Sequence, residues 1–512
     1  MKMMHVGGWM AGLWALSLGV ASAATGIWIN TSGGDFSEPG NWQDGVVPIA
    51  ANDSAFFTNT ESYTVTLDES VTNNQVRFNA SSGTHVVDLA GKTWAQTGIL
   101  YVGHSSPGNA DVRMNGGRLV SQSLQMGNQS SSGALTLSGV TGSVSGNAQF
   151  GIGMTGTGVL TLASEDTALL VSGTGNHPVG NGAGAFGAIV ISNGFLGVTG
   201  NLYVGNSGVG DLWIGEGTAV VAGTIGLGFI TNSTGRLTLA GPGAEFNGGP
   251  RMGVGAGAMG AVYLSNGTWR AAGEFKLGEA GEGHVEIAGG TLYVTNTLSY
   301  SVTNQVVTNG LDVVTNLVTN ISVVANSQIY IPFGSGTGRL VMTSADSRLF
   351  QEAINSSVQI SNGTNGYGLV VVSNGLMDVM EVDIADGRAT AGAMYLYNGT
   401  CIVRRTGQST FNVGSALFST GRLVVADSRA LLVVTNGAGI VLGGQTANSQ
   451  YTNANGRLDF DSGTIITRGL NIAFGRNSSA EVVIKDGKLI NVSNNGIIVG
   501  NGVDSQAALI LA

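Results

Sequence analysis

The sequence predicts an all-β protein that folds as a right-handed parallel β-helix (β-solenoid), with about three short strands in each coil of roughly 25 residues. Three observations support this fold class: a high glycine content, apolar residues at every second position, and an internal repeat. The 512 residues include 84 glycines, and 43% of them are hydrophobic. The composition therefore provides apolar side chains for a core and many residues suited to tight corners.

The internal repeat is clearest in two stretches of equal length. GDLWIGEGTAVVAGTIGLG begins at Gly210 and GAVYLSNGTWRAAGEFKLG begins at Gly260, and both place glycines and apolar residues at the same offsets although they share few residues. An internal period of this length is typical of a solenoid, a propeller or an array. Further units start at Gly133, Gly187, Gly235 and Gly283, and the starts from Gly187 to Gly283 are 23, 25, 25 and 23 residues apart.

Within each unit the apolar residues alternate with other residues, which indicates strands. Val262 and Leu264 flank Tyr263, for example, so their side chains are expected on one face of a strand and that of Tyr263 on the other. A propeller blade needs roughly 40 residues or more and four antiparallel strands, whereas three short strands fit one coil of a parallel β-helix. Equivalent residues must then stack from coil to coil, which explains the fixed offsets.

The corners between strands are expected at the glycines and at pairs such as Asn266-Gly267, where a positive φ is needed. We expect Leu, Val and Ile at the inner positions, and Thr, Ser, Arg, Tyr and Trp at the outer ones. Asparagines at equivalent turns are expected to form ladders. About 14 to 16 coils follow Gly98, which gives a rod on the order of 70 Å long.

The chain begins with the features of a secretory signal peptide, residues 1–23. These are Lys2, an apolar stretch from Trp9 to Val20, and the small residues Ala21-Ser22-Ala23 before a cleavage site. The apolar stretch is shorter than the roughly 20 residues that a membrane-spanning helix needs, so we expect no transmembrane span in the mature chain. We therefore expect export to the cell surface, with an outer membrane-associated or extracellular location.

Residues 24–96 are predicted to form an N-terminal β cap over the first coil, and residues 97–512 the β-helix repeats. The cap segment contains Trp28, Trp42 and Trp94, together with the paired strand-like runs YTVTL and QVRF. A solenoid requires such a cap because its first coil is otherwise open.

An insertion interrupts the repeats at about residues 297–328. Two runs rich in β-branched residues flank Asn309-Gly310, which is a strong signal for a hairpin, so we predict a β-hairpin arm that protrudes from the rod. At the other end, the repeat pattern restarts after Gly500. We expect the last coil to be open, so the sequence is either a fragment of a longer passenger or a chain whose end is covered by another molecule.

The segment from Ile27 to Phe57 resembles the start of exported bacterial proteins with autotransporter-associated β-strand repeats. Such chains often begin with a Trp, an Asn-Trp pair, a Gly-x-x-Pro, and an Asp before paired aromatics. Here the corresponding residues are Trp28, Asn41-Trp42, Gly45 to Pro48, Asp53 and Phe56-Phe57. The resemblance implies a β-solenoid passenger on or outside the cell surface.

Carboxylates in one segment are the main candidates for chemistry. MEVDIADGR places Glu381, Asp383 and Asp386 before Arg388, and Glu381 and Asp383 are expected on one face of a strand. Such a pair can bind Ca²⁺ or act as acid and base. We interpret the segment instead as a solvated strand face with an aspartate in the turn.

Asp459 and Asp461 in RLDFDSGT receive the same interpretation. The Asp-Asp, Gly-His-Gly and Arg-Ile-Lys signatures of polygalacturonase-like enzymes are missing from the sequence, as is the Gly-Gly-x-Gly-x-Asp calcium repeat. We therefore expect no catalytic residue, no cofactor and no metal site.

His284 lies near Glu279, Glu282 and Glu286 but has no second histidine at ligand spacing, so we expect it at a coil edge. Cys401, the only cysteine, excludes an intramolecular disulfide and is expected to be a small buried hydrophobic residue.

Tyr203, Trp213 and Tyr263 are expected to face outward. Either they form a stripe that stacks against sugars or, as we expect, they are scattered surface aromatics.

A net charge of −10 without a run of Lys or Arg argues against nucleic acid as a partner. We expect an exported, non-enzymatic β-solenoid with a structural or adhesive role at the cell surface, whose partners are cell-envelope components, glycans or copies of itself. Two alternatives stay open. A polysaccharide lyase or hydrolase should show carboxylates with Lys or Arg in a cleft, and a glycan-binding module on a pectate-lyase-like β-helix should show a continuous aromatic stripe.

Overall fold

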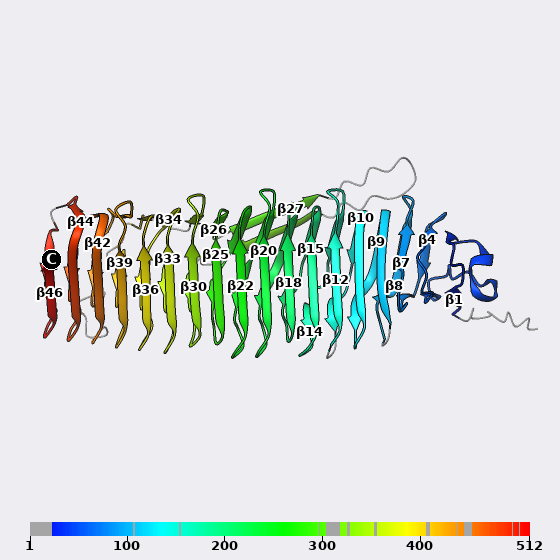
Figure 1. The fold of residues 1–512 in the computed structure, drawn as a ribbon, viewed down its shortest axis with the longest axis horizontal. Coiled ribbons are helices and arrows are strands. Elements are labelled where there is room, and N and C mark those ends of the chain that lie inside the picture. Colours follow the sequence, from blue (N-terminus) through cyan, green and yellow to red (C-terminus); the bar gives the residue numbers. More distant parts are fainter. Residues whose placement is uncertain are drawn as a thin grey trace, which may run out of the picture.

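The computed structural model shows a long rod in which the β-strands lie across the rod axis (Figure 1). It describes residues 23–105, 108–152, 155–295, 297–303, 318–324, 328–352, 356–405, 410–437, 439–444, 453–493, 495–500 and 502–512. Strands make up 59% of the chain and form a parallel β-solenoid of about 17 turns with a spacing of about 25 residues, which confirms the predicted fold class. Within the described ranges, no helix has the length and apolar character needed to cross a membrane. Residues 1–22 of the predicted signal peptide lie outside these ranges.

The turns contribute to three parallel ladders, called A, B and C in the order in which they follow one another within a repeat. Ladder A contains β2 (Gly34–Asp35), β4 (Tyr63–Thr66), β7 (Thr84–Asp88), β9 (Asn109–Asn128), β10 (Ser132–Val144), β12 (Thr157–Leu162), β15 (Phe186–Ile191), β18 (Val209–Ile214), β20 (Thr234–Leu239), β22 (Met259–Leu264), β25 (Glu282–Ile287), β30 (Thr337–Met342), β33 (Tyr367–Val372), β36 (Ala391–Leu396), β39 (Thr420–Val425), β42 (Asn455–Thr467), β44 (Ser479–Asn491) and β46 (Gln506–Leu511).

Ladder B contains β5 (Val71–Asn73), β8 (Thr93–Val102), β13 (Ala168–Val171), β16 (Phe195–Val198), β19 (Thr218–Leu227), β21 (Glu245–Met252), β23 (Thr268–Ala272), β26 (Thr291–Thr295), β31 (Arg348–Gln351), β34 (Leu376–Val379), β37 (Thr400–Val403) and β40 (Leu431–Val434). Strands β9, β10, β42 and β44 continue from ladder A into ladder B.

Ladder C contains β1 (Thr25–Trp28), β3 (Ser54–Phe57), β6 (Gln75–Phe78), β11 (Ala148–Ile152), β14 (Asn176–Asn181), β17 (Asn201–Val204), β24 (Phe275–Leu277), β29 (Ile329–Ile331), β32 (Val358–Ile360), β35 (Val382–Ile384), β38 (Phe411–Val413), β41 (Ile440–Leu442), β43 (Leu470–Ile472) and β45 (Ile497–Val499). The ends of β8, β9, β19 and β21 also pair in this ladder.

The register of ladder A confirms the predicted alignment of the repeat. Gly210 pairs with Gly187 on one side and with Gly235 on the other, and Gly260 pairs with Gly235 and Gly283. The glycines that share an offset in the sequence therefore form one continuous row along the rod.

Alternation along each strand places one set of side chains in the core. In β22, Val262 and Leu264 are completely buried, whereas Tyr263 between them is only partly buried. The same pattern in all three ladders builds one apolar core that runs the length of the rod. The predicted inner positions of Leu, Val and Ile are confirmed, but the outer position predicted for Trp is wrong for Trp94 and Trp269, which are completely buried.

The corner between ladders C and A requires a left-handed residue in most turns. Gly205 has φ +70°, and a Cβ atom there would lie 2.0 Å from the carbonyl oxygen of Thr234 in the next coil. Asparagines also form the expected ladders beside the corners: Asn206 donates from Nδ2 to Oδ1 of Asn181, at 2.7 Å.

The N-terminal end of the rod is covered by a compact aromatic cluster. Two short 3-10 helices, η1 (Pro39–Asn41) and η2 (Gln43–Gly45), follow β1 and β2 at this end (Figure 1). The rings of Trp28 and Trp42 meet edge to face at 5.1 Å, and the indole Nε1 of Trp42 donates to the carbonyl oxygen of Phe36 at 2.6 Å.

Parallel pairing crosses the predicted boundary between cap and repeats at residue 97. Ladder C runs back without a break from β8 through β6 and β3 to β1. The predicted pair of runs also belongs to different ladders, because β4 pairs with β7 in ladder A and β6 pairs with β3 in ladder C. The first coils are therefore coils of the solenoid that have aromatic residues in their core.

The insertion leaves the rod between ladders B and C. Strands β27 (Thr297–Thr303) and β28 (Val318–Val324) pair antiparallel with each other in a separate two-stranded sheet, as a hairpin arm requires. The predicted turn at Asn309-Gly310 lies outside the described residues.

Candidate functional site

The structure places Asp383 on the outer surface of ladder C and Asp386 just after the corner that ends the same strand. Asp383 lies on β35, where it pairs in register with Gln359 on β32 and with Asn412 on β38. Its neighbours Val382 and Ile384 are core residues, so strand alternation directs Asp383 outward. Adjacent side chains nevertheless leave Asp383 only 3% exposed.

Asp386 follows the corner that ends β35. The corner residue, Ala385, has φ +60°, which glycine supplies in other turns, and Asp386 comes directly after it. The side chain of Asp386 accepts a hydrogen bond from Oγ of Ser415 at 3.2 Å. Burial, and then the negative charge of Asp383, raise the pKa of Asp386 to about 7. Burial and the neighbouring charge of Asp383 thus both disfavour the ionised form of Asp386.

Asn412 completes this cluster from the next coil. It is fully buried, and its Nδ2 donates to Oδ1 of Asp383 at 2.6 Å. Its own Oδ1 is buried and makes no hydrogen bond. We call Asp383, Asp386, Asn412 and Ser415 the acid pair cluster.

The other two members of the predicted group lie apart from this cluster. Glu381 forms an ion pair with Arg405, and Arg388 is exposed, with its backbone in an isolated bridge to Thr364. The interpretation of MEVDIADGR as a solvated strand face is therefore wrong for both Glu381 and Asp383, which are only 7% and 3% exposed.

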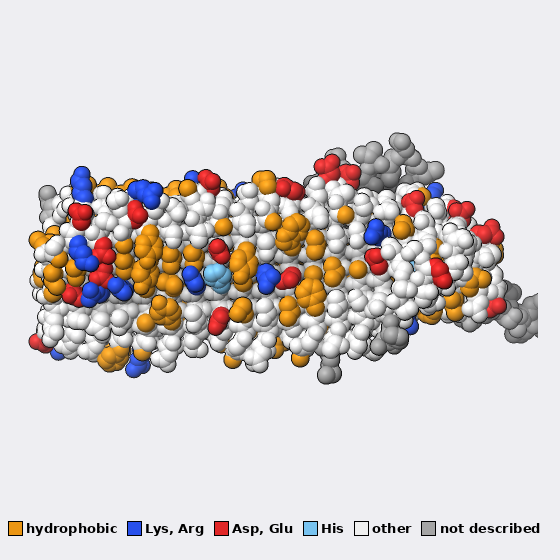
Figure 2. All heavy atoms as spheres, viewed as in Figure 1, with side chains coloured by type: hydrophobic (Ala, Val, Ile, Leu, Met, Phe, Trp, Pro, Cys, Tyr) orange, Lys and Arg blue, Asp and Glu red, His pale blue; other side chains and the backbone are white. Residues whose placement is uncertain are grey.

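Asp459 and Asp461 take part in ion pairs on the outer surface of ladder A. Asp459 accepts from Nε of both Arg422 and Arg457, each at 2.8 Å, and it is also largely buried. Arg457 reaches Glu481 at 2.5 Å. Asp461 is more exposed and pairs with Nζ of Lys485 at 2.8 Å. Figure 2 shows red and blue side chains gathered near the C-terminal end of the visible face.

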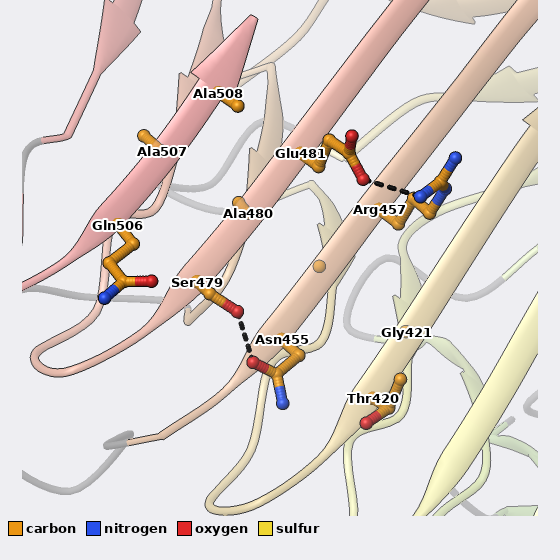
Figure 3. Close-up of a pocket in the computed structure, with 11 residues that line it drawn as sticks. Thr420, Gly421, Asn455, Arg457, Ser479, Ala480, Glu481, Gln506, Ala507 and Ala508 are labelled. Carbon is orange, nitrogen blue, oxygen red and sulfur yellow. Dashed lines mark hydrogen bonds and ion pairs between the residues drawn. The ribbon is translucent and has the colours of Figure 1, made fainter.

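A shallow groove of about 460 Å³ lies beside this network, across the last strands of ladder A (Figure 3). Small residues form its floor, and polar side chains rise from β42 and β44 around it. Oγ of Ser479 donates to Oδ1 of Asn455 there. The groove is lined by Thr420, Gly421, Asn455, Gly456, Arg457, Ser479, Ala480, Glu481, Gln506, Ala507 and Ala508.

Cys401 is buried as expected, whereas His284 lies within β25 in register with Ala261 and Arg339, and not at a coil edge. Nε2 of His284 lies 3.9 Å from Glu286, whereas Glu279 instead accepts both hydrogen bonds of the Arg251 guanidinium. Burial and the charge of Arg339 lower the pKa of His284, although Glu286 opposes them. Cys401 is completely buried, and burial, with the charge of Asp378, raises the pKa of its thiol to about 12. Its thiol is therefore protonated and unreactive.

The three singled-out aromatics do not share one stripe. Trp213 and Tyr263 lie in the same outward row of ladder A, with Thr238 between them, and Trp213 is 37% exposed. Tyr203 lies on ladder C, where its ring stacks on Phe229 at 4.0 Å.

Sequence reasoning missed Asn412 and Ser415 in the acid pair cluster, and Arg457 and Glu481 in the groove. In the backbone register Asn412 pairs with Asp383, whereas Arg457 pairs with Glu481 and with neither Asp459 nor Asp461. In the described ranges, no group of three or more His, Cys, Asp or Glu side chains is arranged to hold a metal ion. A comparison with known protein families, with curated proteins and with solved structures finds no match for this chain.

Proposed function

We propose that the protein is an exported, non-enzymatic rod with a structural or adhesive role at the cell surface. The observation that supports this proposal is the continuity of the three ladders through about 17 turns. At a strand spacing of about 4.8 Å such a rod is on the order of 80 Å long. Outward rows that repeat at this spacing can contact an extended partner at many points, and many weak contacts add up to high avidity.

Two features of the sequence support location at the surface. The first 23 residues have the organisation of a signal peptide, and the segment from Ile27 to Phe57 resembles the start of chains with autotransporter-associated β-strand repeats. Fusing residues 1–30 to a reporter that is active only after export tests the first feature. A reporter that stays inside the cell contradicts the proposal.

Binding by the chain from Ala24 onward tests the adhesive role. Beads that carry this chain should bind isolated cell-envelope material or a polysaccharide, and the bound material should be released chemically unchanged. New reducing ends or unsaturated sugar products would instead favour the alternative of a polysaccharide hydrolase or lyase. Loss of such products in both Asp383→Asn and Asp386→Asn variants would assign the chemistry to the acid pair cluster.

A glycan-binding module is the second candidate function, and the groove across β39, β42, β44 and β46 favours it. Hydroxyl, amide and charged groups rise around a floor of small residues, which is the arrangement that hydrogen-bonds sugar hydroxyls (Figure 3). This candidate predicts that Asn455→Leu and Gln506→Leu each weaken binding of a polysaccharide. The matched variant Gln359→Leu, on ladder C, should retain the binding. Equal binding by all three variants contradicts it.

A further inference from the structure

Three basic side chains lie in the outer row of ladder C: Arg77 on β6, Arg251 on β21 and Lys276 on β24. Two of them pair with a carboxylate of the chain. Arg251 donates two hydrogen bonds to Glu279, each at 2.7 Å, and Nζ of Lys276 lies 2.6 Å from Glu274. Arg77 forms no ion pair with any residue that the structure describes. Its positive charge is therefore open to an anion from outside the chain.

Two aromatic rings fix the position of the Arg77 guanidinium. Arg77 pairs in register with Phe56 on one side and with Tyr101 on the other. Its Cζ lies 5.0 Å from the centre of the Phe56 ring and 5.5 Å from the centre of the Tyr101 ring, which is the distance of a cation–π contact. The guanidinium thus lies between the rings, and a ligand that binds to it loses little side-chain entropy.

The outer end of this guanidinium is open to solvent. Nε of Arg77 is buried and makes no hydrogen bond. Nη1 and Nη2 also make no hydrogen bond with the described residues, but they are not among the buried atoms, so they reach the surface. A guanidinium fork matches the two oxygens of a carboxylate in a bidentate pair. Arg77 therefore presents an unused fork for a planar anion.

The row continues from Tyr101 to two side-chain amides, Gln125 on β9 and Gln149 on β11. Oε1 of Gln125 accepts from Nδ2 of Asn128 at 3.4 Å, so its Nε2 remains as a donor. The amide of Gln149 makes no hydrogen bond with the described residues and also reaches the surface. Amides bind hydroxyl groups as donors and as acceptors. Four coils at a spacing of about 4.8 Å place the fork and the amides along roughly 14 Å, which is long enough for a short oligosaccharide.

We propose that Arg77, Gln125 and Gln149 form a binding site for an acidic sugar on ladder C. Nη1 and Nη2 of Arg77 bind the carboxylate, and the two amides bind hydroxyls of the same glycan. The net charge of −10 disfavours a densely charged polymer, so we expect uronic acid residues that are separated by neutral sugars. The choice of a sugar as the partner rests on the proposed adhesive role, whereas the carboxylate is assigned by the fork alone.

Calorimetric titration of residues 24–512 with methyl glucuronide tests the site. Arg77→Gln should weaken binding by about tenfold or more, because it removes a charged donor. Arg77→Lys keeps a cation between the rings but lacks the fork, so it should fold and still bind more weakly than the parent. Arg251→Gln is the matched control in the same row and should leave the titration unchanged. Methyl glucoside, which has the same ring without the carboxylate, should bind at least about tenfold more weakly than the glucuronide.

The NMR titration of His104 gives a second readout. Its ring meets the Tyr101 ring edge to face at 4.3 Å, and burial, followed by the charge of Arg77, lowers its pKa. A carboxylate bound to Arg77 neutralises that charge, so saturation with methyl glucuronide should raise the pKa of His104. The other histidines of residues 24–512 are internal controls and should not change: His85, His177 and His284.

The proposal is overturned if the parent chain does not bind methyl glucuronide at millimolar concentration, or if Arg77→Gln binds it as tightly as Arg251→Gln does. Acetate or glucose 6-phosphate that binds as tightly as the glucuronide would also overturn it, since the site would then not select an acidic sugar. Loss of the glucuronide site alone leaves the adhesive role intact if beads that carry the chain still bind envelope material. Beads that bind no envelope material would count against the adhesive role alone, provided that the glucuronide binds.

Discussion

A Cβ atom on Gly210 would lie 2.0 Å from the backbone nitrogen of Gly205, the left-handed corner residue that precedes it in the same turn. Gly210 belongs to the row that includes Gly187 and Gly235. The strand of ladder A passes so close to the corner of its own turn that no side chain fits between them, and this is why the row consists of glycines.

Gly210→Ala should therefore destabilise the rod by on the order of 2 kcal/mol or more, because the backbone of the corner must move. The midpoint of thermal unfolding measures the effect. Gly40→Ala is the matched control, since a Cβ atom at Gly40 meets only Oε1 of Glu38, at 3.6 Å. Equal midpoints for the two variants would show that the corner can move freely.

Trp42→Ala should destabilise the N-terminal end by about 3–5 kcal/mol. The substitution leaves a cavity between Trp28 and Phe36, and it removes the donor to the Phe36 carbonyl oxygen. Trp213→Ala, on the outer surface of ladder A, should change stability by about 0.5 kcal/mol or less. Hydrogen exchange should locate the loss of protection in the first coils, and an unchanged exchange pattern there contradicts the prediction.

Asp386 should make the stability of the rod depend on pH. Its pKa is raised in the folded state, so its stabilising contribution is complete below the ordinary aspartate pKa of 3.8 and is lost as the pH rises through about 7. Asp386→Asn removes the ionisable carboxyl group, so the variant does not lose this stability as the pH rises. The melting temperature of the variant relative to the parent should therefore be higher at pH 8 than at pH 5, in buffers that contain a chelator. A difference that does not change with pH would mean that Asp386 is ionised throughout this range.

Asp459→Asn should destabilise the rod by about 1–3 kcal/mol, because Arg422 and Arg457 would lose the buried carboxylate that both contact. The loss should shrink at high salt, where the repulsion between the two guanidinium groups is screened. Asp427→Asn removes a carboxylate from a solvent-exposed pair with Arg429 and should have no measurable effect. A loss for Asp459→Asn that is independent of salt would point to packing instead of charge.

A chain made of residues 24–512 should associate through β46 as its concentration rises. Leu511 on β46 is 76% exposed, and Leu509 beside it is also exposed, although their counterparts in the preceding coil face the core. Replacing both with Lys should keep the chain monomeric, since inward-pointing charges block edge pairing. The control variant Met259→Lys changes an exposed position in the middle of the rod, so it should associate as the parent chain does. Light scattering against concentration distinguishes these outcomes.

Much of the fold could be predicted because stacking requires equivalent residues at equal offsets. This requirement is visible in the sequence as the equal spacing of Gly210, Gly235 and Gly260 and as the apolar alternation around Tyr263. The start of the repeats was harder to locate. Trp94 stacks on Leu119 in ladder B and is fully buried, so it is a core residue of an ordinary coil, but its size hides the repeat.

The acid pair cluster could be predicted only in part. The spacing of Asp383 and Asp386 was visible, but their burial depends on Gln359 and Asn412 from neighbouring coils. Those residues lie 24 and 29 positions away, so the coil that leads to Asn412 is longer than the one that leads to Asp383. A fixed period therefore does not align them, and only the backbone register identifies them as neighbours.

The continuous register of ladder A has one more consequence, for the length of the molecule. Each coil contacts mainly the coils on either side, so one complete unit can be removed without a change in the chemistry of either end. Deleting residues 210–234 would bring Gly235 next to Gly187 and shorten the rod by about 4.8 Å. The number of repeat units therefore sets the length of the rod, and the glycines of the ladder A row mark where each unit begins.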